Sequence, residues 1–179
     1  MTQLPNILLV MTDQHRQGFT AGEDFALDTM PRLDALASRG TRVRHAYTTS
    51  PACVPARTSL LTGRFPSAHR VRQNSAVHEV LRGPDLLDVL REAGYSLHFA
   101  GKTHMYRGPE DFDSFAGPYW HVEGPEAGDE DAEFAEWLRG IDHGPSLEPT
   151  PFGLERQFPH RIVSDAIAAL DARGAASSG

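Results

Sequence analysis

An unbroken apolar run near the start of the chain predicts its first element. Residues 7–11 read Ile-Leu-Leu-Val-Met between polar neighbours. Such a run is typical of a strand that is buried on both faces of a parallel sheet. We therefore expect a strand over residues 5–12. A second, half-buried strand is predicted over residues 43–47, where apolar and aromatic side chains alternate with arginine.

Helical patterns lie between and after these segments. Thr29 can cap a helix that ends at Gly40, and Gly63 and Gly94 follow two further helical stretches. The last helical stretch carries apolar residues on one side at helical spacing. Helices are therefore predicted over residues 29–39, 55–62, 84–93, 132–138 and 156–172.

A third strand is predicted over residues 95–100, directly after the glycine that ends one of these helices. The alternation of strands and helices predicts a layered α/β fold with a mostly parallel central sheet. Residues 108–131 are rich in glycine, proline and acids, so we interpret them as a loop or an insertion. The small residues 174–179 are expected to form a flexible tail.

Composition narrows the classes of function. The 179 residues carry a formal net charge of -7, which argues against a general nucleic-acid-binding protein. No apolar run approaches the roughly 20 residues that span a bilayer. The first run is also too short for the core of a signal peptide, so we expect a cytoplasmic protein without a membrane partner. The single cysteine, Cys53, excludes an intrachain disulfide and a four-thiolate zinc site.

Polar residues follow each of the predicted strands. Asp13 and Gln14 come directly after the first strand. The helix that carries Cys53 follows the second strand, and Lys102 and His104 follow the third. In open α/β sheets, ligands gather at the carboxyl ends of the strands. The side chains expected to line one cleft are therefore those of Asp13, Gln14, Cys53, Arg57, Lys102 and His104.

The most specific segment begins at the cysteine. Residues 53–64 read Cys-Val-Pro-Ala-Arg-Thr-Ser-Leu-Leu-Thr-Gly-Arg. Pro55 suits an early position in a helix, and the first backbone N–H groups of a helix suit an anionic ligand. Arg57 lies about one helical turn after Cys53, so both side chains can face one site. The alternative interpretation is a buried cysteine on a helix with a solvated arginine.

This segment matches the C-x-P-x-R signature of the sulfatase family and the Leu-Leu-Thr-Gly helix behind it, so the chain resembles that family. Residues 5–14 resemble the opening strand of sulfatases and the metal-binding pair that follows it. The Asp13-Gln14 pair resembles the choline-sulfatase and phosphonate monoester hydrolase branch. Its oxygen atoms suit a hard divalent cation, Ca²⁺ in the first place and Mg²⁺ or Mn²⁺ as alternatives. For Asp13 alone, an Asx turn at the end of a strand is the simpler interpretation.

Two further segments resemble the same family. Residues 101–104, Gly-Lys-Thr-His, resemble its Gly-Lys-x-His element. This resemblance implies that Lys102 neutralises the sulfate and that His104 hydrogen-bonds the oxygen of the nucleophile. Residues 72–74 resemble a segment that supplies an asparagine to the sulfate pocket, which implies that Asn74 binds substrate. The resemblance extends over about residues 5–108.

The resemblance implies an alkaline phosphatase-like α/β/α fold, of which this chain is the N-terminal part of a single catalytic domain. It also implies a sulfuric ester hydrolase that acts on small sulfate esters. A formylglycine-generating enzyme would convert Cys53 to formylglycine, which would serve as the nucleophile and as a ligand of the cation. Arg57 would hold the hydrated aldehyde, and Lys102 would offset charge on the transferred group.

Two other functions stay open at this point. A phosphonate monoester or phosphodiester hydrolase would use the same fold and nucleophile, whereas a non-catalytic remnant would have neither activity. The family's later part supplies further metal ligands and a second lysine. Residues 142–144, Asp-His-Gly, resemble that metal element but come early in the chain and within a predicted loop. We therefore expect a missing C-terminal segment or a partner chain, and little or no turnover from residues 1–179 alone.

Overall fold

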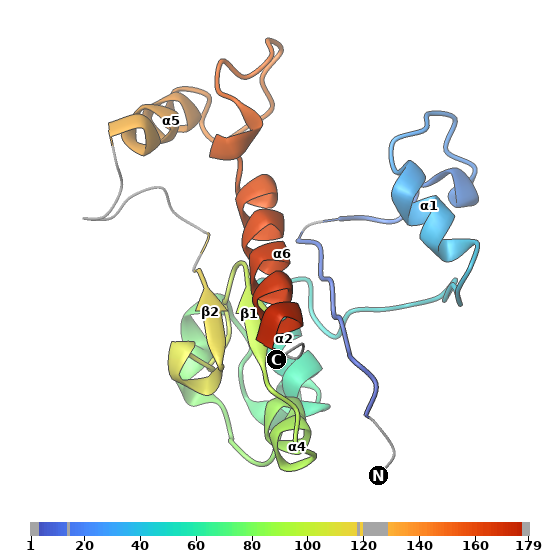
Figure 1. The fold of residues 1–179 in the computed structure, drawn as a ribbon, viewed down its shortest axis with the longest axis vertical. Helices are drawn as coiled ribbons and strands as arrows, with labels where there is room; N and C mark the ends of the chain where they lie inside the picture. The colour runs from blue at the N-terminus through green and yellow to red at the C-terminus, as the bar shows by residue number, and fades with distance from the viewer. Residues whose placement is uncertain (1–3, 14, 118, 120–128, 177–179) are drawn as a thin grey trace. The chain divides into compact units, whose positions relative to one another are not determined.

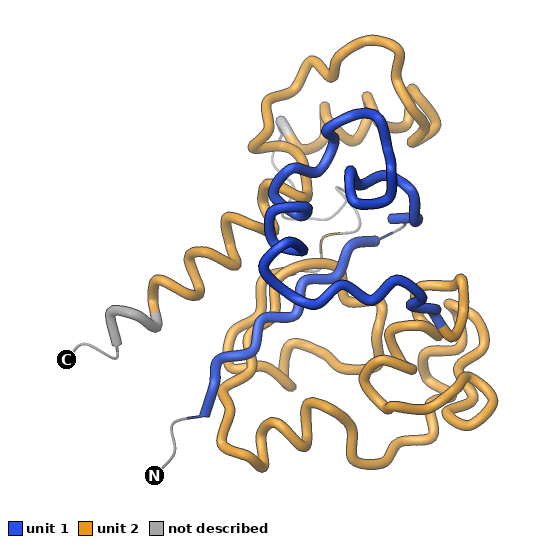
Figure 2. The backbone as a smooth tube through the Cα atoms, turned by 90° about the vertical axis from the view of Figure 1, so that its right-hand side faces the viewer, with its two compact units in different colours: residues 1–48 blue, residues 49–179 orange. Residues whose placement is uncertain are grey.

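Two compact units make up the chain, residues 1–48 and residues 49–179 (Figure 2). The computed structural model describes residues 4–13, 15–117, 119 and 129–176. Every residue expected to take part in the chemistry except Asp13 and Gln14 belongs to the second unit.

The first unit contains two short helices. A 3-10 helix, η1, spans Ala21–Glu23, and helix α1 spans Pro31–Ala37. The carboxylate of Asp34 on α1 accepts hydrogen bonds from the backbone N–H groups of Ala21 and Gly22 at 3.0 and 3.2 Å. These N–H groups stand at the start of η1, and the first N–H groups of a helix have no acceptor within that helix. The Asp34 carboxylate supplies one, and it thereby joins the two helices. Helix α1 confirms the central part of the first predicted helix.

Neither strand predicted for the first unit forms in the described residues. Residues 7–11 join no sheet, and their side chains are 46–76% exposed. Residues 43–47 also lie outside any strand, and Tyr47 is exposed. A strand needs a neighbour with which its backbone groups can pair, and the described part of this unit supplies none. The strand predictions for residues 5–12 and 43–47 are therefore wrong for this structure.

Helix α2, Cys53–Thr62, confirms the helix predicted to end before Gly63. Gly63 closes it at a φ of 65°, a left-handed conformation that glycine adopts without strain. Helix α2 contributes Val54 to a small apolar cluster from which water is excluded. This cluster consists of Val54, Val71 and Ala76, edged by Val77 and Val80.

Three further helices follow α2. Helix α3 spans Pro66–His69 and the 3-10 helix η2 spans Asn74–Glu79, neither of which was predicted. Helix α4, Leu86–Glu92, lies inside the helix predicted over residues 84–93. Asp85 caps its start, because the side-chain Oδ1 accepts hydrogen bonds from the second and third backbone N–H groups at 2.9 and 3.2 Å.

The sheet of this unit has two parallel strands (Figure 1). Strand β1, His98–Ala100, falls inside the predicted third strand, and β2 spans Ser114–Ala116. The 3-10 helix η3, Pro109–Asp111, lies between them. The segment predicted as a loop or an insertion, residues 108–131, contains the short strand β2, which pairs with β1 in register from His98 opposite Ser114. The acidic and glycine-rich composition concealed a strand of only three residues.

Two longer helices complete the second unit. Helix α5 spans Asp129–Gly140, and α6 spans Phe158–Ala176 after the 3-10 helix η4, Leu154–Arg156. Helix α6 packs against β1 and β2 (Figure 1). It also continues through residues 174–176, where the sequence had predicted a flexible tail, whereas residues 177–179 lie outside the described part.

The described architecture is α/β with a small parallel sheet flanked by helices, which agrees in part with the predicted fold class. The described residues form one two-stranded sheet rather than a layered α/β/α structure around a broad central sheet. No helix in the described ranges is both long and apolar enough to cross a membrane.

Candidate functional site

The expected nucleophile stands at the first residue of α2. Cys53 is half-buried, and the capping position before it is occupied by Ala52, whose side chain cannot accept a hydrogen bond. The backbone N–H of Val54 instead donates to Oδ1 of Asn74, at 3.1 Å. Asn74 therefore lies against the helix start that carries Cys53. One of the backbone donors expected to meet an anion is thus already bonded within the chain.

Arg57 joins this helix to the Gly-Lys-Thr-His turn. It is half-buried, one turn after Cys53, and its Nη1 donates to the backbone oxygens of Lys102 and Thr103 at 2.6 and 3.3 Å. The structure thus brings together two segments that are 45 residues apart in the sequence. A charged donor on a carbonyl oxygen is stronger than a neutral one, so this contact fixes the backbone of the turn on α2.

The turn itself begins where β1 ends. Gly101 has a φ of 134°, and its backbone N–H donates to Ala116 at the end of β2, at 2.9 Å. Its carbonyl oxygen accepts the N–H of Tyr119 at 3.3 Å. A β-carbon on Gly117 would stand 2.5 Å from that same oxygen, so only glycine fits there. The backbone just before Lys102 is therefore held by β2 and the residues after it.

His104 ends the turn in a left-handed conformation, with a φ of 40°. This region is uncommon for a residue that has a β-carbon and costs about 1–3 kcal/mol. The side chain is half-buried. Strain of this kind persists only where the surrounding structure imposes it, which makes the contacts on both sides of His104 important.

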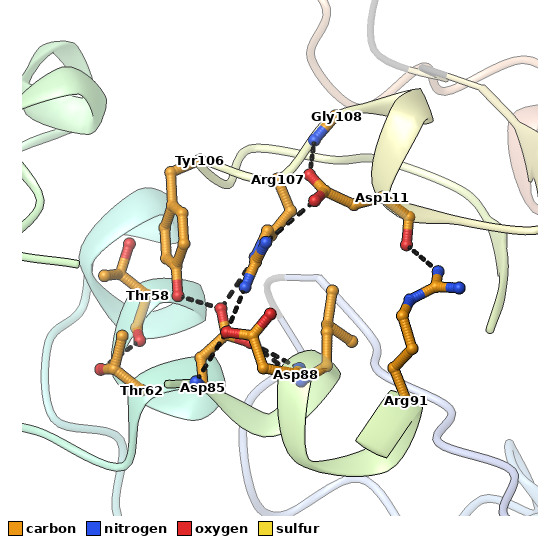
Figure 3. Close-up of polar contacts among 10 residues, drawn as sticks. Thr58, Thr62, Asp85, Asp88, Arg91, Tyr106, Arg107, Gly108 and Asp111 are labelled. Carbon is orange, nitrogen blue, oxygen red and sulfur yellow. Dashed lines mark hydrogen bonds and ion pairs between the residues drawn. The ribbon is translucent and has the colours of Figure 1, made fainter. Parts of the chain in front are cut away.

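An ion cluster lies directly after the turn (Figure 3). Arg107 donates from Nε to Asp85 at 2.9 Å, from Nη2 to Asp88 at 2.6 Å and from Nη1 to Asp111 at 2.9 Å. The hydroxyl of Tyr106 donates to the same Asp85 oxygen at 2.5 Å. The Asp85 side chain is 0% exposed and that of Arg107 is 15% exposed. One guanidinium thus joins three carboxylates at the start of α4 and at η3.

The pKa values of this cluster reflect its burial and its pairing. Burial acts to raise the pKa of Asp85, but the hydrogen bonds from Arg107 and Tyr106 outweigh it and hold that pKa below its usual value. Burial and the nearby Asp85 carboxylate raise the pKa of Tyr106. Hydrogen bonding to Asp85 raises the pKa of Arg107. These directions favour an ionised Asp85, a neutral Tyr106 and a charged Arg107, which are the states that the hydrogen bonds of the cluster require.

A second buried polar pair lies on the far part of α2. Ser59 Oγ and His69 Nε2 are 2.9 Å apart, and both side chains are buried. The backbone N–H of Val71 donates to His69 Nδ1 at 3.1 Å, so Nε2 carries the proton and donates to Ser59. Burial lowers the pKa of His69. The ring cannot take a proton from Ser59 in this tautomer, so the pair is structural.

Asp13 is the one described member of the expected metal-binding pair. It is exposed in the first unit, where it borders a hollow of about 490 Å³ with Phe19 and Met30 among its lining residues. Gln14 lies outside the described residues. Residues 142 and 143 form the turn after α5, with φ values of 51° and 52°, which agrees with the predicted loop.

Comparison with known proteins decides the family. The family model described as "Sulfatase" matches residues 5–127, more than two thirds of the chain. The chain belongs to the sulfatase family. Membership implies the alkaline phosphatase-like α/β fold, with which the parallel strands and helices of the second unit are compatible.

Curated sulfatases match the same part of this sulfatase-family chain. A choline-sulfatase of Rhizobium meliloti is 40% identical over 115 residues, which cover 64% of this chain and 22% of the relative. Arylsulfatase A of Bos taurus is 35% identical over 135 residues, which cover 68% of this chain and 27% of the relative. An N-acetylgalactosamine-6-O-sulfatase of Bacteroides thetaiotaomicron is 31% identical over 120 residues, which cover 65% of this chain and 24% of the relative. The chain thus spans about a quarter of the length of these relatives, and no solved structure matches it.

The sulfatase family generally uses a divalent metal and formylglycine, so the residues of this chain can be tested against that cation. In the part of the chain that the structure describes, no group of three or more His, Cys, Asp or Glu side chains is arranged to hold a metal ion. Asp13 alone offers one carboxylate, whereas Ca²⁺ takes roughly six to eight oxygen ligands. The described residues therefore do not make the cation site by themselves.

The structure also contains site-forming residues that sequence reasoning missed. The sequence predicted the helix over residues 84–93 but no role for Asp85, Tyr106 or Arg107. Their position, two and three residues after His104, was the available signal. It was weak because tyrosine and arginine near a loop are ordinary surface residues, and the three acids that meet Arg107 come from two separate segments.

Proposed function

We propose that this chain is the N-terminal part of a sulfuric ester hydrolase whose nucleophile is formylglycine made from Cys53. One observation carries the proposal beyond family membership. Arg57, which follows Cys53 by one turn of α2, donates to the carbonyl oxygens of Lys102 and Thr103. The signature helix and the Gly-Lys-Thr-His turn, which the sequence suggested as parts of one site, are therefore in direct contact.

The chain's own residues supply binding and orientation in this proposal. Lys102 offsets the negative charge of the sulfate group, and His104 hydrogen-bonds the oxygen of the modified residue 53. Asn74, held against the start of α2, contributes its amide to the sulfate pocket. Arg57 fixes the turn that carries Lys102, a role that adds to its expected contact with the hydrated aldehyde.

Formylglycine accounts for the need to modify the cysteine. Its hydrate would supply two hydroxyl groups, one whose oxygen could attack sulfur as the alcohol leaves, and one whose proton could be lost as the aldehyde re-forms and sulfate leaves. A thiol has no second hydroxyl and cannot complete that last step. Covalent catalysis of this kind divides one difficult displacement into two easier ones.

The divalent cation belongs to the proposal in a limited form. Asp13, Gln14 and the modified residue 53 are the ligands that this chain would contribute, with Ca²⁺ favoured over Mg²⁺ and Mn²⁺ because the donors are oxygen atoms. The remaining ligands would come from sequence beyond these residues or from a partner chain. This expectation agrees with the comparisons, in which the chain covers only about a quarter of the length of its relatives.

Mass spectrometry of the peptide that contains residue 53 tests the nucleophile. After expression with a formylglycine-generating enzyme, we expect that peptide to be about 18 Da lighter than the cysteine form, the difference between a thiol and an aldehyde side chain. Arg57→Ala, which removes one element of the C-x-P-x-R signature, should lower the modified fraction. Unmodified cysteine in the chain, with a control substrate fully converted in the same cells, would refute the proposal.

Paired substrates test the class of ester. The modified chain should hydrolyse an aryl sulfate faster than the matching aryl phosphonate monoester, at rates well below the roughly 1–10³ s⁻¹ of ordinary enzymes. The Cys53→Ala variant, which cannot be modified, should show neither activity. A preference for the phosphonate would favour the phosphonate monoester hydrolase instead. Complete modification with no turnover on either ester would mean that residues 1–179 lack part of the cation site, as the missing ligands predict.

A further inference from the structure

The Lys102–His104 turn adopts a conformation that the chain does not favour locally. His104 has a φ of 40°, and Gly101 before it has a φ of 134°. An isolated loop would relax out of the left-handed region, since a residue with a β-carbon gains free energy by doing so. Contacts outside the turn must therefore hold it in place.

The start of the turn is held from α2. Arg57 donates to the carbonyl oxygens of Lys102 and Thr103, and both of these residues precede His104. This contact restrains the backbone on one side only. A strained residue between one fixed and one loose side would still turn freely about its own ψ, so a second restraint is needed after it.

The end of the turn is held from α4. Tyr106 and Arg107 both donate to one oxygen of Asp85, at 2.5 and 2.9 Å (Figure 3). The other Asp85 oxygen accepts the backbone N–H groups of Leu87 and Asp88. A single carboxylate thus joins the first turn of α4 to the residues just after His104. Because the Asp85 side chain is 0% exposed, water does not compete for these bonds.

The same carboxylate also connects the turn with the helix of the nucleophile. Helix α4 packs against α2, which begins with Cys53. Arg57 on α2 therefore bonds to the start of the turn, and Asp85 before α4 bonds to the residues just after it. The two helices are themselves in contact. This arrangement fixes the distance between the Lys102 segment and the start of α2, although neither Asp85 nor Arg107 lies in the Gly-Lys-Thr-His element.

We propose that Asp85, Tyr106 and Arg107 form a positioning cluster that holds Lys102 and His104 in the orientation needed for sulfate ester hydrolysis. This inference rests on the proposed function for its catalytic consequence, but its geometric part does not. Displacement of a group by about 1 Å from its working position lowers rates by about 10²-fold, so we expect kcat to fall while KM changes little. The three residues act through the turn and do not touch substrate.

Three variants separate positioning from general stability. Asp85→Asn keeps a side-chain oxygen for the N–H groups of α4 but places an amide where Tyr106 and Arg107 donate. Tyr106→Phe removes one hydroxyl and nothing else. Arg107→Lys keeps the positive charge but cannot reach three carboxylates at once, so it should give an intermediate effect. The matched control is Arg91→Gln, which removes an exposed contact between α4 and Asp111 and Asp113 without touching Asp85.

Two-dimensional NMR of the isotope-labelled chain is the deciding measurement. We expect the backbone signals of residues 101–104 and the ring signals of His104 to move in Asp85→Asn and Tyr106→Phe, and to stay in place in Arg91→Gln. Signals from α5 should be unchanged in all variants, which shows that the fold is intact. Where Asp85→Asn fails to fold, Tyr106→Phe decides alone.

The outcomes distinguish this inference from the proposed function. Unmoved signals for residues 101–104 in folded Asp85→Asn and Tyr106→Phe would overturn the positioning role, whatever the activity of the chain. Moved signals together with a fall in kcat at constant KM would support it. Moved signals without turnover would support the geometric role alone, because the proposed function places part of the cation site outside these residues. Cys53 that stays unmodified beside a fully converted control would refute the proposed function and leave the geometric role standing.

Discussion

The two units hold their residues in place in different ways. In the first unit, the apolar residues 7–11 are 46–76% exposed, and the Asp34 carboxylate links its two helices. In the second unit, the buried Asp85 pairs with the half-buried Arg107, and two parallel strands pair and pack against α6. The second unit therefore contains its own structural partners, whereas the described part of the first unit supplies no strand to pair with its apolar run.

This difference shows which interactions depend on distant sequence. A helix cap or a left-handed glycine needs only residues within a few positions of itself. A buried strand needs two neighbouring strands and a layer on each face. Residues 7–11 have the composition of such a strand, but the described residues of their own unit supply no strand to pair with them.

The largest expected effect comes from the buried carboxylate of the second unit. Asp85→Ala should lower the free energy of unfolding by about 3–5 kcal/mol, because it removes both the cap of α4 and the buried carboxylate that pairs with Arg107. The counterpart in the first unit, Asp34→Ala, should cost about 1 kcal/mol, the value of an ordinary hydrogen bond. Urea unfolding followed by circular dichroism measures both. Equal losses would mean that the two units are not organised differently.

A smaller loss is expected at the glycine that faces the turn. Gly117→Ala should destabilise the chain more than Gly94→Ala, although both residues have a positive φ. Each substitution forces a side chain into an unfavourable backbone region at about 1–3 kcal/mol. Only at Gly117 does the new β-carbon also meet the Gly101 oxygen, at 2.5 Å, whereas nothing lies within 4 Å at Gly94. Thermal unfolding midpoints that rank the two variants in the opposite order would contradict this packing.

The pH dependence of stability should reveal His69. Burial lowers the pKa of His69 in the folded chain, so the unfolded chain binds the proton more tightly. Its contribution to stability is therefore complete above the unfolded pKa of about 6.5 and is lost as the pH falls through the lower, folded value. His69→Gln should flatten this part of the curve of unfolding free energy against pH. An unchanged slope in that variant would show that other groups cause the acid loss.

The smallest effect is expected in the exposed run of the first unit. Val10→Thr should change the free energy of unfolding of this chain by less than about 0.5 kcal/mol, since Val10 is 76% exposed. The matched change in the second unit, Val54→Thr, places a hydroxyl in the buried cluster and should cost about 1–3 kcal/mol. A loss at Val10 as large as that at Val54 would indicate that residues 7–11 are packed as the strand that the sequence predicted.

Local signals in the sequence predicted most of the second unit. Gly63 marked the end of α2, Gly94 followed α4, and Pro55 lay early in α2, where its missing N–H costs nothing. Strand β2 was missed because three residues leave too short a pattern for periodicity to detect. The strands of the first unit were predicted wrongly, because composition reports how a segment can be buried and not whether a partner is present.

The residues of the candidate site were likewise predicted only where a local motif marks them. Motif resemblance identified Cys53, Arg57 and Lys102 as parts of one site, and the hydrogen bonds of Arg57 join their segments. The Asp85 cluster escaped prediction because it depends on the fold to bring α4 beside the turn. The placement of Asp13 relative to Cys53 stays a prediction, since these residues belong to different units.

One measurement tests the central claim, that the start of α2 and the Gly-Lys-Thr-His turn form one site. Cys53 is the chain's only cysteine, so a nitroxide label can be attached there without any substitution. Nearby amide protons then lose NMR signal intensity relative to the reduced, diamagnetic label. We predict the strongest losses at Asn74 and at residues 102–104, with α5 as the unaffected reference. Full intensity at residues 102–104 would place the turn away from Cys53 and would contradict the account.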